Sequence, residues 1–120
     1  MDNKTTIKEL KSLVATFVKE RDWSQFHSPK NLSMDIAVEA AELMEKFLWI
    51  ESKDSLDEYC KNKEEVEDEL ADIFIALLCF VNSCDIDLSK AFHKKLSETS
   101  KKYPVELVKG RHYKYTHYKK

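Results

Sequence analysis

A shortage of glycine limits what this chain can fold into. Its 120 residues include one glycine, Gly110, and two prolines, Pro29 and Pro104, where average usage would give about 8 glycines and 6 prolines. A Gly-rich phosphate loop could not be built from one glycine, and a β-sandwich would lack glycines for its turns. Long helices with few tight turns remain, so we predict an all-α fold.

Length, charge and cysteine content narrow the class of protein further. The length fits one domain over residues 1–120. With 20 Lys and Arg against 22 Asp and Glu, the net charge of −2 gives no overall attraction to nucleic acid or membranes. The three cysteines form no CxxC motif, which argues against a disulfide framework or a zinc site. No signal-peptide core is present, and the longest apolar run is nine residues, 73–81, against the ~20 of a membrane span. We therefore expect a soluble, cytoplasmic protein.

Apolar side chains spaced three and four residues apart predict four helices, over residues 5–21, 32–50, 64–84 and 88–102. The second is apolar on nearly every side, which is typical of a buried helix, and Asn31 or Ser33 is its expected cap because Pro29 disfavours a helix before it. Asp87 is the expected cap of the fourth helix. We expect a loop that can hold one short turn over 51–63 and a basic, aromatic tail over 105–120. The architecture would be an antiparallel bundle of about four helices.

Two pairs of acids occupy places where apolar residues predominate. Glu39 and Glu42 interrupt the most apolar helix, and Glu69 and Asp72 repeat the spacing on the third helix. Residues three apart share a helix face, and antiparallel packing could bring the pairs together. Clustered carboxylates need a compensating cation. Oxygen ligands without Cys or His favour Mg²⁺ or Mn²⁺ over Zn²⁺, although ExxE and ExxD spacings are also common on solvated helix faces.

Mg²⁺ held by carboxylates usually keeps positions open for substrate phosphates, so phosphate chemistry is the natural use of such a site. Aromatic side chains flank the second helix and could stack on a nucleobase, or could simply close the core: Trp23, Phe26, His27 and Trp49. Cations near the end of the fourth helix could hold phosphates, or could simply stabilise the helix terminus: Lys94, Lys95, Lys101 and Lys102.

These motifs match a known family in their order and spacing. The strings AVEAAELMEKFLW, VEDELADIFIALLCF and DLSKAFHKKLSETSKKYPVE resemble the MazG-like nucleotide pyrophosphohydrolases, and ERDWSQFHSPKNL resembles the branch that includes the dCTP pyrophosphatases. The family signature is EExxE followed by ExxD. Here Val38 replaces its first acid, so any role of that acid cannot be carried over.

The resemblance implies a reaction and a set of site residues. The four matching acids would bind Mg²⁺, and water would attack the α-phosphorus of a nucleoside triphosphate to give a monophosphate and pyrophosphate. Trp23, His27 and Trp49 would line the base pocket. Lys95, Lys102 and Tyr103 would contact phosphates or sugar, with Thr99 in place of the usual Asn. The implied fold is an all-α bundle that forms homodimers or homotetramers, with the site near a subunit interface.

Three hypotheses follow. The first is a Mg²⁺-dependent pyrophosphohydrolase that prefers dCTP or a modified dCTP, with Glu39, Glu42, Glu69 and Asp72 as metal ligands, Glu39 also the candidate that activates water, and Mn²⁺ a possible substitute for Mg²⁺. The second is a broad-specificity enzyme in which the two tryptophans only close the core. The third is a non-enzymatic helical module whose acidic helices bind a basic partner. Nucleic-acid binding by the tail has weaker support.

Overall fold

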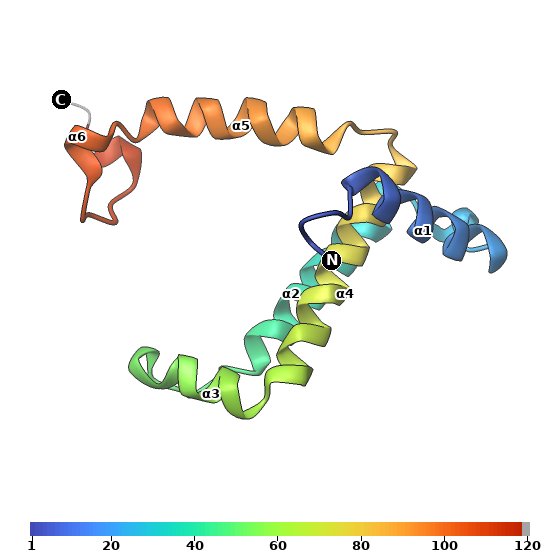
Figure 1. Cartoon of the computed structure of the whole chain (residues 1–120), viewed down its shortest axis with the longest axis horizontal. Helices are drawn as coiled ribbons and strands as arrows, with labels where there is room; N and C mark the ends of the chain where they lie inside the picture. Colours follow the sequence, from blue (N-terminus) through green and yellow to red (C-terminus); the bar gives the residue numbers. More distant parts are fainter. Residues whose placement is uncertain (119–120) are drawn as a thin grey trace. The chain divides into compact units, whose positions relative to one another are not determined.

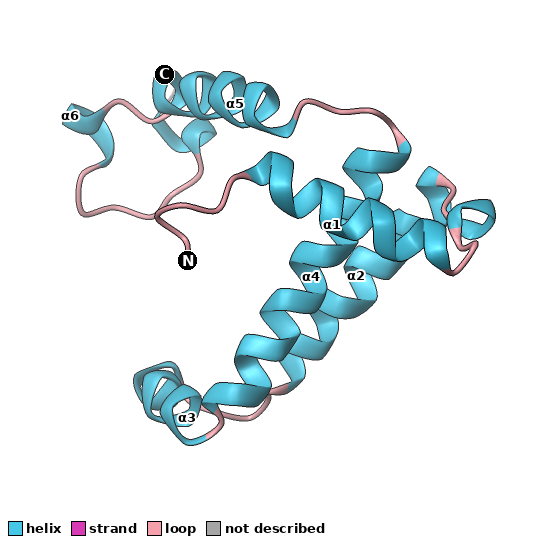
Figure 2. Ribbon diagram, turned by 45° about the vertical axis from the view of Figure 1, so that its right-hand side comes forward, coloured by secondary structure: helices cyan, strands magenta, loops and turns pink. Residues whose placement is uncertain are grey.

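The computed structural model describes residues 1–118, and these residues form helices and loops with no strand (Figure 2). The prediction of an all-α fold is therefore confirmed. The chain forms two compact units, Met1–Asp85 and Ile86–Lys120, each held by its own contacts. The expected single domain over residues 1–120 stays a prediction.

The first unit contains four α-helices and two short 3₁₀ helices. The α-helices are α1 (Ile7–Glu20), α2 (Pro29–Glu45), α3 (Ser55–Lys61) and α4 (Lys63–Ser83), and the 3₁₀ helices are η1 (Ser24–Phe26) and η2 (Ser52–Asp54). Helices α2 and α4 lie side by side and antiparallel, and α1 also packs against α4 (Figure 1). The predicted helices over 5–21 and 64–84 are confirmed within one or two residues at their ends.

Helix α2 begins and ends earlier than predicted. Pro29 occupies its first turn, and the Ser28 hydroxyl accepts a hydrogen bond from the backbone N–H of Asn31 at 3.1 Å. The prediction of Asn31 or Ser33 as cap was wrong because proline is favoured in the first helical turn, where its missing N–H costs nothing. The helix ends at Glu45, and residues 46–49 form turns that lead to Trp49 with a φ of 65°.

The segment predicted as a loop over 51–63 is mostly helical. Helices η2 and α3 fill it, and α3 carries acids in its first turn and Lys61 in its last. These charges complement the helix dipole and stabilise a short helix that has little apolar periodicity. The loop prediction was based on apolar periodicity, which does not detect stabilisation by charges at the helix ends.

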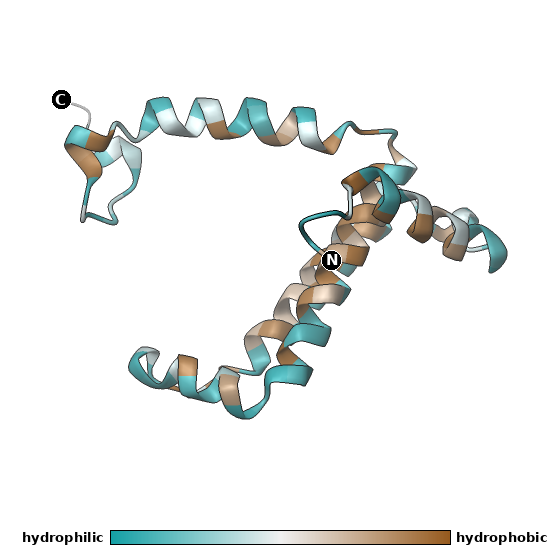
Figure 3. Cartoon of the chain, viewed as in Figure 1, coloured by the Kyte–Doolittle hydropathy of each residue, from teal (hydrophilic) through white to brown (hydrophobic). Residues whose placement is uncertain are grey.

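Helix α2 is far less buried within one chain than its composition predicted. Leu32 is its one buried residue, whereas Val38 is 54% exposed and Met34 and Met44 are each 58% exposed. Figure 3 shows brown, hydrophobic residues along both α2 and α4. The neighbouring helices cover one side of α2 and leave its other apolar side open.

The second unit contains α5 (Leu88–Lys102), α6 (Val105–Val108) and η3 (Tyr115–Tyr118). The Asp87 carboxylate caps α5 by accepting a hydrogen bond from the N–H of Lys90 at 3.0 Å, as predicted. Gly110 has a φ of 77°, a conformation that side chains with a Cβ rarely adopt, so the lone glycine lies at a turn that requires it. Lys119 and Lys120 of the predicted tail lie outside the described residues.

Candidate metal centre

The antiparallel seam between α2 and α4 sets the geometry of the site. Along α2 the residues that face α4 recur every three or four positions, as do their partners on α4. At one end of the seam Leu32 packs with Cys79 and Val18 in the apolar core. One to three turns further along, the same two helix faces carry acids instead of apolar side chains. The register that builds the core therefore also brings the acids together.

The four acids predicted from the sequence do converge. One carboxylate oxygen from each of Glu39, Glu42, Glu69 and Asp72 lies within 4.8 Å of all the others. The first three side chains are half-buried and Asp72 is exposed, so the cluster opens to solvent on one side. One oxygen of Glu39 and one of Glu69 are buried without a hydrogen-bond partner among the described residues. Four carboxylates at this spacing, with two oxygens lacking partners, fit a hard divalent cation such as Mg²⁺.

Electrostatics at the cluster are unfavourable without a cation. Burial, followed by the neighbouring carboxylates of Glu42, Asp72 and Asp35, raises the pKa of Glu39 to about 7. Burial and the Glu42 carboxylate also raise the pKa of Glu69, and the ammonium of Lys46 offsets part of this effect. Because a divalent cation would relieve this repulsion, the arrangement of charges favours metal binding.

Two charged residues that influence the pKa values of this cluster were not predicted from the sequence. Asp35 lies one turn before Glu39 on the same helix face, and its i, i+4 spacing was the signal that could have revealed it. Lys46 also forms an ion pair with Glu65, with Nζ 3.5 Å from Oε2. It follows the end of α2, where the predicted helix continued, so its approach to α4 could not be anticipated.

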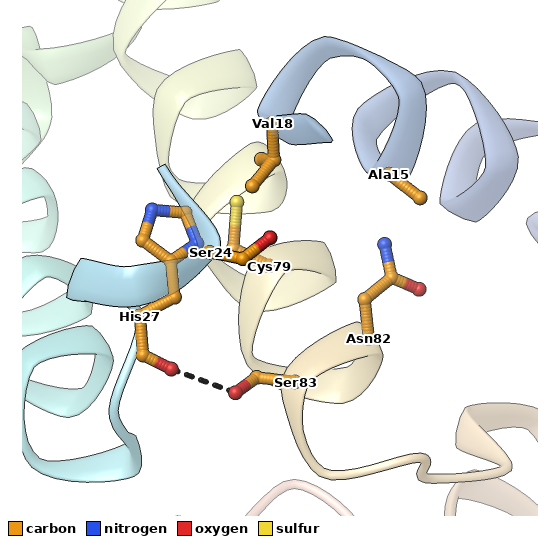
Figure 4. A pocket seen from close by; sticks show the side chains of 7 residues that line it. All are labelled: Ala15, Val18, Ser24, His27, Cys79, Asn82 and Ser83. Carbon is orange, nitrogen blue, oxygen red and sulfur yellow. Dashed lines mark hydrogen bonds between the residues drawn. The ribbon is translucent and has the colours of Figure 1, made fainter. Parts of the chain in front are cut away.

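His27 lies at the apolar end of the seam, beside a hollow of about 200 Å³ between α1, η1 and α4 that Val18 and Cys79 also line (Figure 4). The backbone carbonyl of His27 accepts a hydrogen bond from the Ser83 hydroxyl at 2.7 Å. Asn82 also lines the hollow, and its side-chain amide donates to the Lys11 carbonyl at 2.9 Å. The sequence identified His27 but not Asn82 and Ser83, because polar residues at the end of an apolar helix are ordinary and give no sign of a binding site.

The two tryptophans lie at opposite ends of α2. Trp23 precedes the helix and packs edge-to-face on Phe17, with ring centroids 5.6 Å apart. Trp49 follows it, is 97% exposed and lines a different, acidic hollow of about 430 Å³ with Asp54 and Asp57. A helix of 17 residues is about 25 Å long. One chain therefore does not bring Trp49 to the hollow beside His27.

The predicted phosphate contacts belong to the second unit. Lys95 pairs with Glu98 at 3.9 Å. Lys102 lies 4.8 Å from the ring centroid of Tyr115, and the hydroxyl of the half-buried Tyr103 accepts a hydrogen bond from the Tyr115 N–H. No helix among residues 1–118 is long and apolar enough to cross a membrane.

Comparisons with known proteins agree with the motifs. A profile of the MazG-like family matches residues 34–117. The dCTP pyrophosphatase 1 of Rattus norvegicus is 35% identical over 113 residues, which cover 92% of this chain and 66% of the rat protein. The Homo sapiens protein of the same name is 33% identical over 113 residues, again 92% of this chain and 66% of that protein. The chain thus spans just under two thirds of these relatives.

A solved structure shows the same likeness. The crystal structure of a pyrophosphatase from Archaeoglobus fulgidus matches this chain with a TM-score of 0.79 and 35% sequence identity. The match covers 82% of this chain and 92% of the archaeal one.

Proposed function

The chain belongs to the MazG-like family, and from this premise we propose that it is a nucleotide pyrophosphohydrolase. It hydrolyses a nucleoside triphosphate between the α- and β-phosphates and releases a nucleoside monophosphate and pyrophosphate. One observation supports this proposal above the others: four carboxylate groups from two antiparallel helices converge within 4.8 Å. Relatives named dCTP pyrophosphatase 1 and pyrophosphatase support the same reaction.

The four carboxylates would hold Mg²⁺, or Mn²⁺ in its place, as inner ligands. When bound, such a cation neutralises phosphate oxygens and polarises the phosphorus. Glu39 has a buried oxygen without a partner among the described residues, and this oxygen can accept the proton of the attacking water. The oxygen of that water then bonds to the α-phosphorus, the bond to the bridging oxygen breaks, and pyrophosphate leaves.

The preferred substrate in this proposal is dCTP or a modified dCTP. The names of the relatives support it, and Trp23, His27 and Trp49 would line the base pocket. Lys95, Lys102 and Tyr103 would contact phosphates or sugar. Removal of unwanted nucleotides from the cytoplasmic pool is the corresponding role.

A homodimer or homotetramer is part of the proposal. Six large apolar side chains on α2 and α4 are between 39% and 58% exposed in one chain: Met34, Val38, Met44, Leu70, Ile75 and Leu77. Burying side chains of this kind contributes roughly 25 cal/mol per Å² of apolar area. A second copy would cover them and could supply the aromatic residues that one chain holds apart.

The test is an assay of all common nucleotides for pyrophosphate release in the presence of Mg²⁺. Glu42→Gln should abolish turnover and leave the helical circular dichroism intact, because it removes one ligand charge without removing bulk. Glu45→Gln, an exposed acid on the same helix, is the matched control and should remain active. Orthophosphate as the sole product would disprove the cleavage position, and an active Glu42→Gln would disprove the ligand assignment.

A broad-specificity enzyme is the second candidate. The edge-to-face packing of Trp23 on Phe17 favours it, since a tryptophan engaged with its own chain can serve packing alone. The 97% exposure of Trp49 speaks against the same role for that residue. Equal kcat/KM values across the four dNTPs would favour this candidate over dCTP preference.

A further inference from the structure

The tail after Pro104 contacts the residues of α5 that are predicted to bind phosphates. The backbone N–H of Tyr115 donates a hydrogen bond to the Tyr103 hydroxyl at 3.1 Å. The two rings pack edge-to-face, with centroids 6.1 Å apart and an interplanar angle of 81°. The Lys102 ammonium lies 4.8 Å from the centroid of the Tyr115 ring. One tail residue therefore engages two adjacent residues at the end of α5.

The Tyr115 contact keeps the charge of Lys102 available. An aromatic face attracts an ammonium group and orients it without supplying a counter-charge. Lys94 and Lys95, by contrast, both lie beside the Glu98 carboxylate, at 4.0 and 3.9 Å. Lys102 is thus held by a neutral partner, which suits a cation that must meet an anionic ligand.

The Tyr103 hydroxyl is also prepared for an anion. Its oxygen accepts the Tyr115 N–H, so its own proton stays available for donation to another acceptor. Phosphate oxygens are strong hydrogen-bond acceptors near neutral pH. A hydroxyl fixed in this way complements them, as the Lys102 ammonium does.

Lys102 and Tyr115 border a hollow of about 420 Å³ in the second unit. Among the described residues its lining contains two lysines and no acid: Lys101, Lys102, Pro104, Leu107, Tyr115 and Tyr118. The Tyr118 hydroxyl is buried and has no hydrogen-bond partner among residues 1–118. A further hydroxyl without a partner, beside two ammonium groups, again suits an anion. The volume fits a small ligand such as a diphosphate.

We propose that Tyr115 is a positioning residue that holds Lys102 and Tyr103 for the two terminal phosphates of the substrate, the part released as pyrophosphate. This inference rests on the proposed function. It adds a tail residue to the predicted phosphate-binding residues Lys102 and Tyr103. Tyr115 itself does not contact the reacting atoms; it acts through its two neighbours.

Product inhibition separates this role from a structural one. Inorganic pyrophosphate and the nucleoside monophosphate are used as separate inhibitors of nucleotide hydrolysis by the 120-residue chain. Tyr115→Leu should raise the inhibition constant for pyrophosphate about three- to fivefold, the range expected for loss of a partly exposed cation–π contact, and should shift the constant for the monophosphate far less. Tyr115→Phe keeps the ring and should restore the pyrophosphate constant. Equal shifts for both products would overturn the inference.

Lys102 provides the second test. In a Lys102→Met background, Tyr115→Leu should raise the pyrophosphate constant little further, because the cation that the ring positions is gone. If the two substitutions instead raise the pyrophosphate inhibition constant by independent factors that multiply, the proposed role of Tyr115 is wrong. Pyrophosphohydrolase activity would remain in that case, so failure of this inference can be told apart from failure of the proposed function. Absence of nucleotide turnover in the unmodified protein would refute both.

Two controls complete the design. Tyr113→Leu removes a tail tyrosine whose ring stacks on His117, with centroids 4.3 Å apart. If it raises the inhibition constant for pyrophosphate as much as Tyr115→Leu does, the positioning role of Tyr115 is wrong. Tyr115→Met fills the same space with a flexible chain and replaces Tyr115→Leu where the latter does not fold. Loss of oligonucleotide binding in Tyr115→Leu with an unchanged pyrophosphate constant would assign the tail to nucleic acid and overturn the proposal.

Discussion

Replacing Glu39 by glutamine should change how the stability of the metal-free protein depends on pH. Glu39 has a pKa of about 7 in the folded chain, against an ordinary value of 4.5. The folded state therefore binds this proton more tightly than the unfolded state does. The corresponding stabilisation is complete below pH 4.5 and is lost as the pH rises through 7.

The structure also sets the size of this effect. A pKa difference of this size corresponds to at most ~3 kcal/mol in the free energy of unfolding. Because the cluster opens to solvent beside the exposed Asp72, screening reduces the expected value to ~1 to 2 kcal/mol. Glu69, whose pKa is raised by burial and by Glu42, is present in both proteins, so their difference reports the loss of the Glu39 carboxyl together with its interactions with neighbouring acids.

Urea unfolding in EDTA at pH 5 and pH 8 is the assay. Between these values the unmodified protein should lose ~1 to 2 kcal/mol more of its unfolding free energy than Glu39→Gln does. Glu45→Gln, with an exposed side chain on the same helix, should behave as the unmodified protein. The same pH dependence in the unmodified protein and in Glu39→Gln would refute the reasoning, as would an equal effect of Glu45→Gln.

Three further predictions concern the cation, the base and the assembly. Mg²⁺ or Mn²⁺ at 100 times its Kd should raise the unfolding free energy by ~2.7 kcal/mol and should have little effect on Glu42→Gln; an unchanged Tm in the unmodified protein would favour the acidic interaction module. Trp49→Ala should change stability by less than ~0.5 kcal/mol because the side chain is 97% exposed, yet raise the KM for dCTP more than for dTTP; equal changes would contradict a role in base selection. Val38→Asp should lower the mass seen in sedimentation velocity, because it charges an apolar face that is open in one chain; an unchanged mass would place the interface elsewhere.

The convergence of the four acids could be predicted because it depends on short-range regularities. A spacing of three on each helix gives a shared face, and α2 and α4 pack side by side and antiparallel. Apolar periodicity on α4 fixed the rotation of that helix, so Glu69 and Asp72 had to face α2. The all-α fold followed from the same pattern and from the lone glycine.

The start of α2 and helix α3 could not be read in the same way. A proline breaks the interior of a helix but is favoured in the first helical turn. The Ser28 cap places Pro29 in the first turn of α2. Helix α3 is stabilised by charges that complement its dipole, which apolar periodicity does not report. Both errors arise where local capping or charge outweighs burial.

The low burial of α2 has a different origin, and it bears on how the site is completed. A helix that is apolar on most sides predicts that something covers it, but the pattern does not say whether the cover is the same chain. One chain covers the side that carries Leu32 and leaves Val38 and Met44 open. The same helix separates Trp49 from His27 by about 25 Å, while both acid pairs meet at its centre. Under the proposed function, the four carboxylates would hold the cation within one chain, whereas base recognition by residues at both ends of α2 would need a second copy bound at the exposed apolar side.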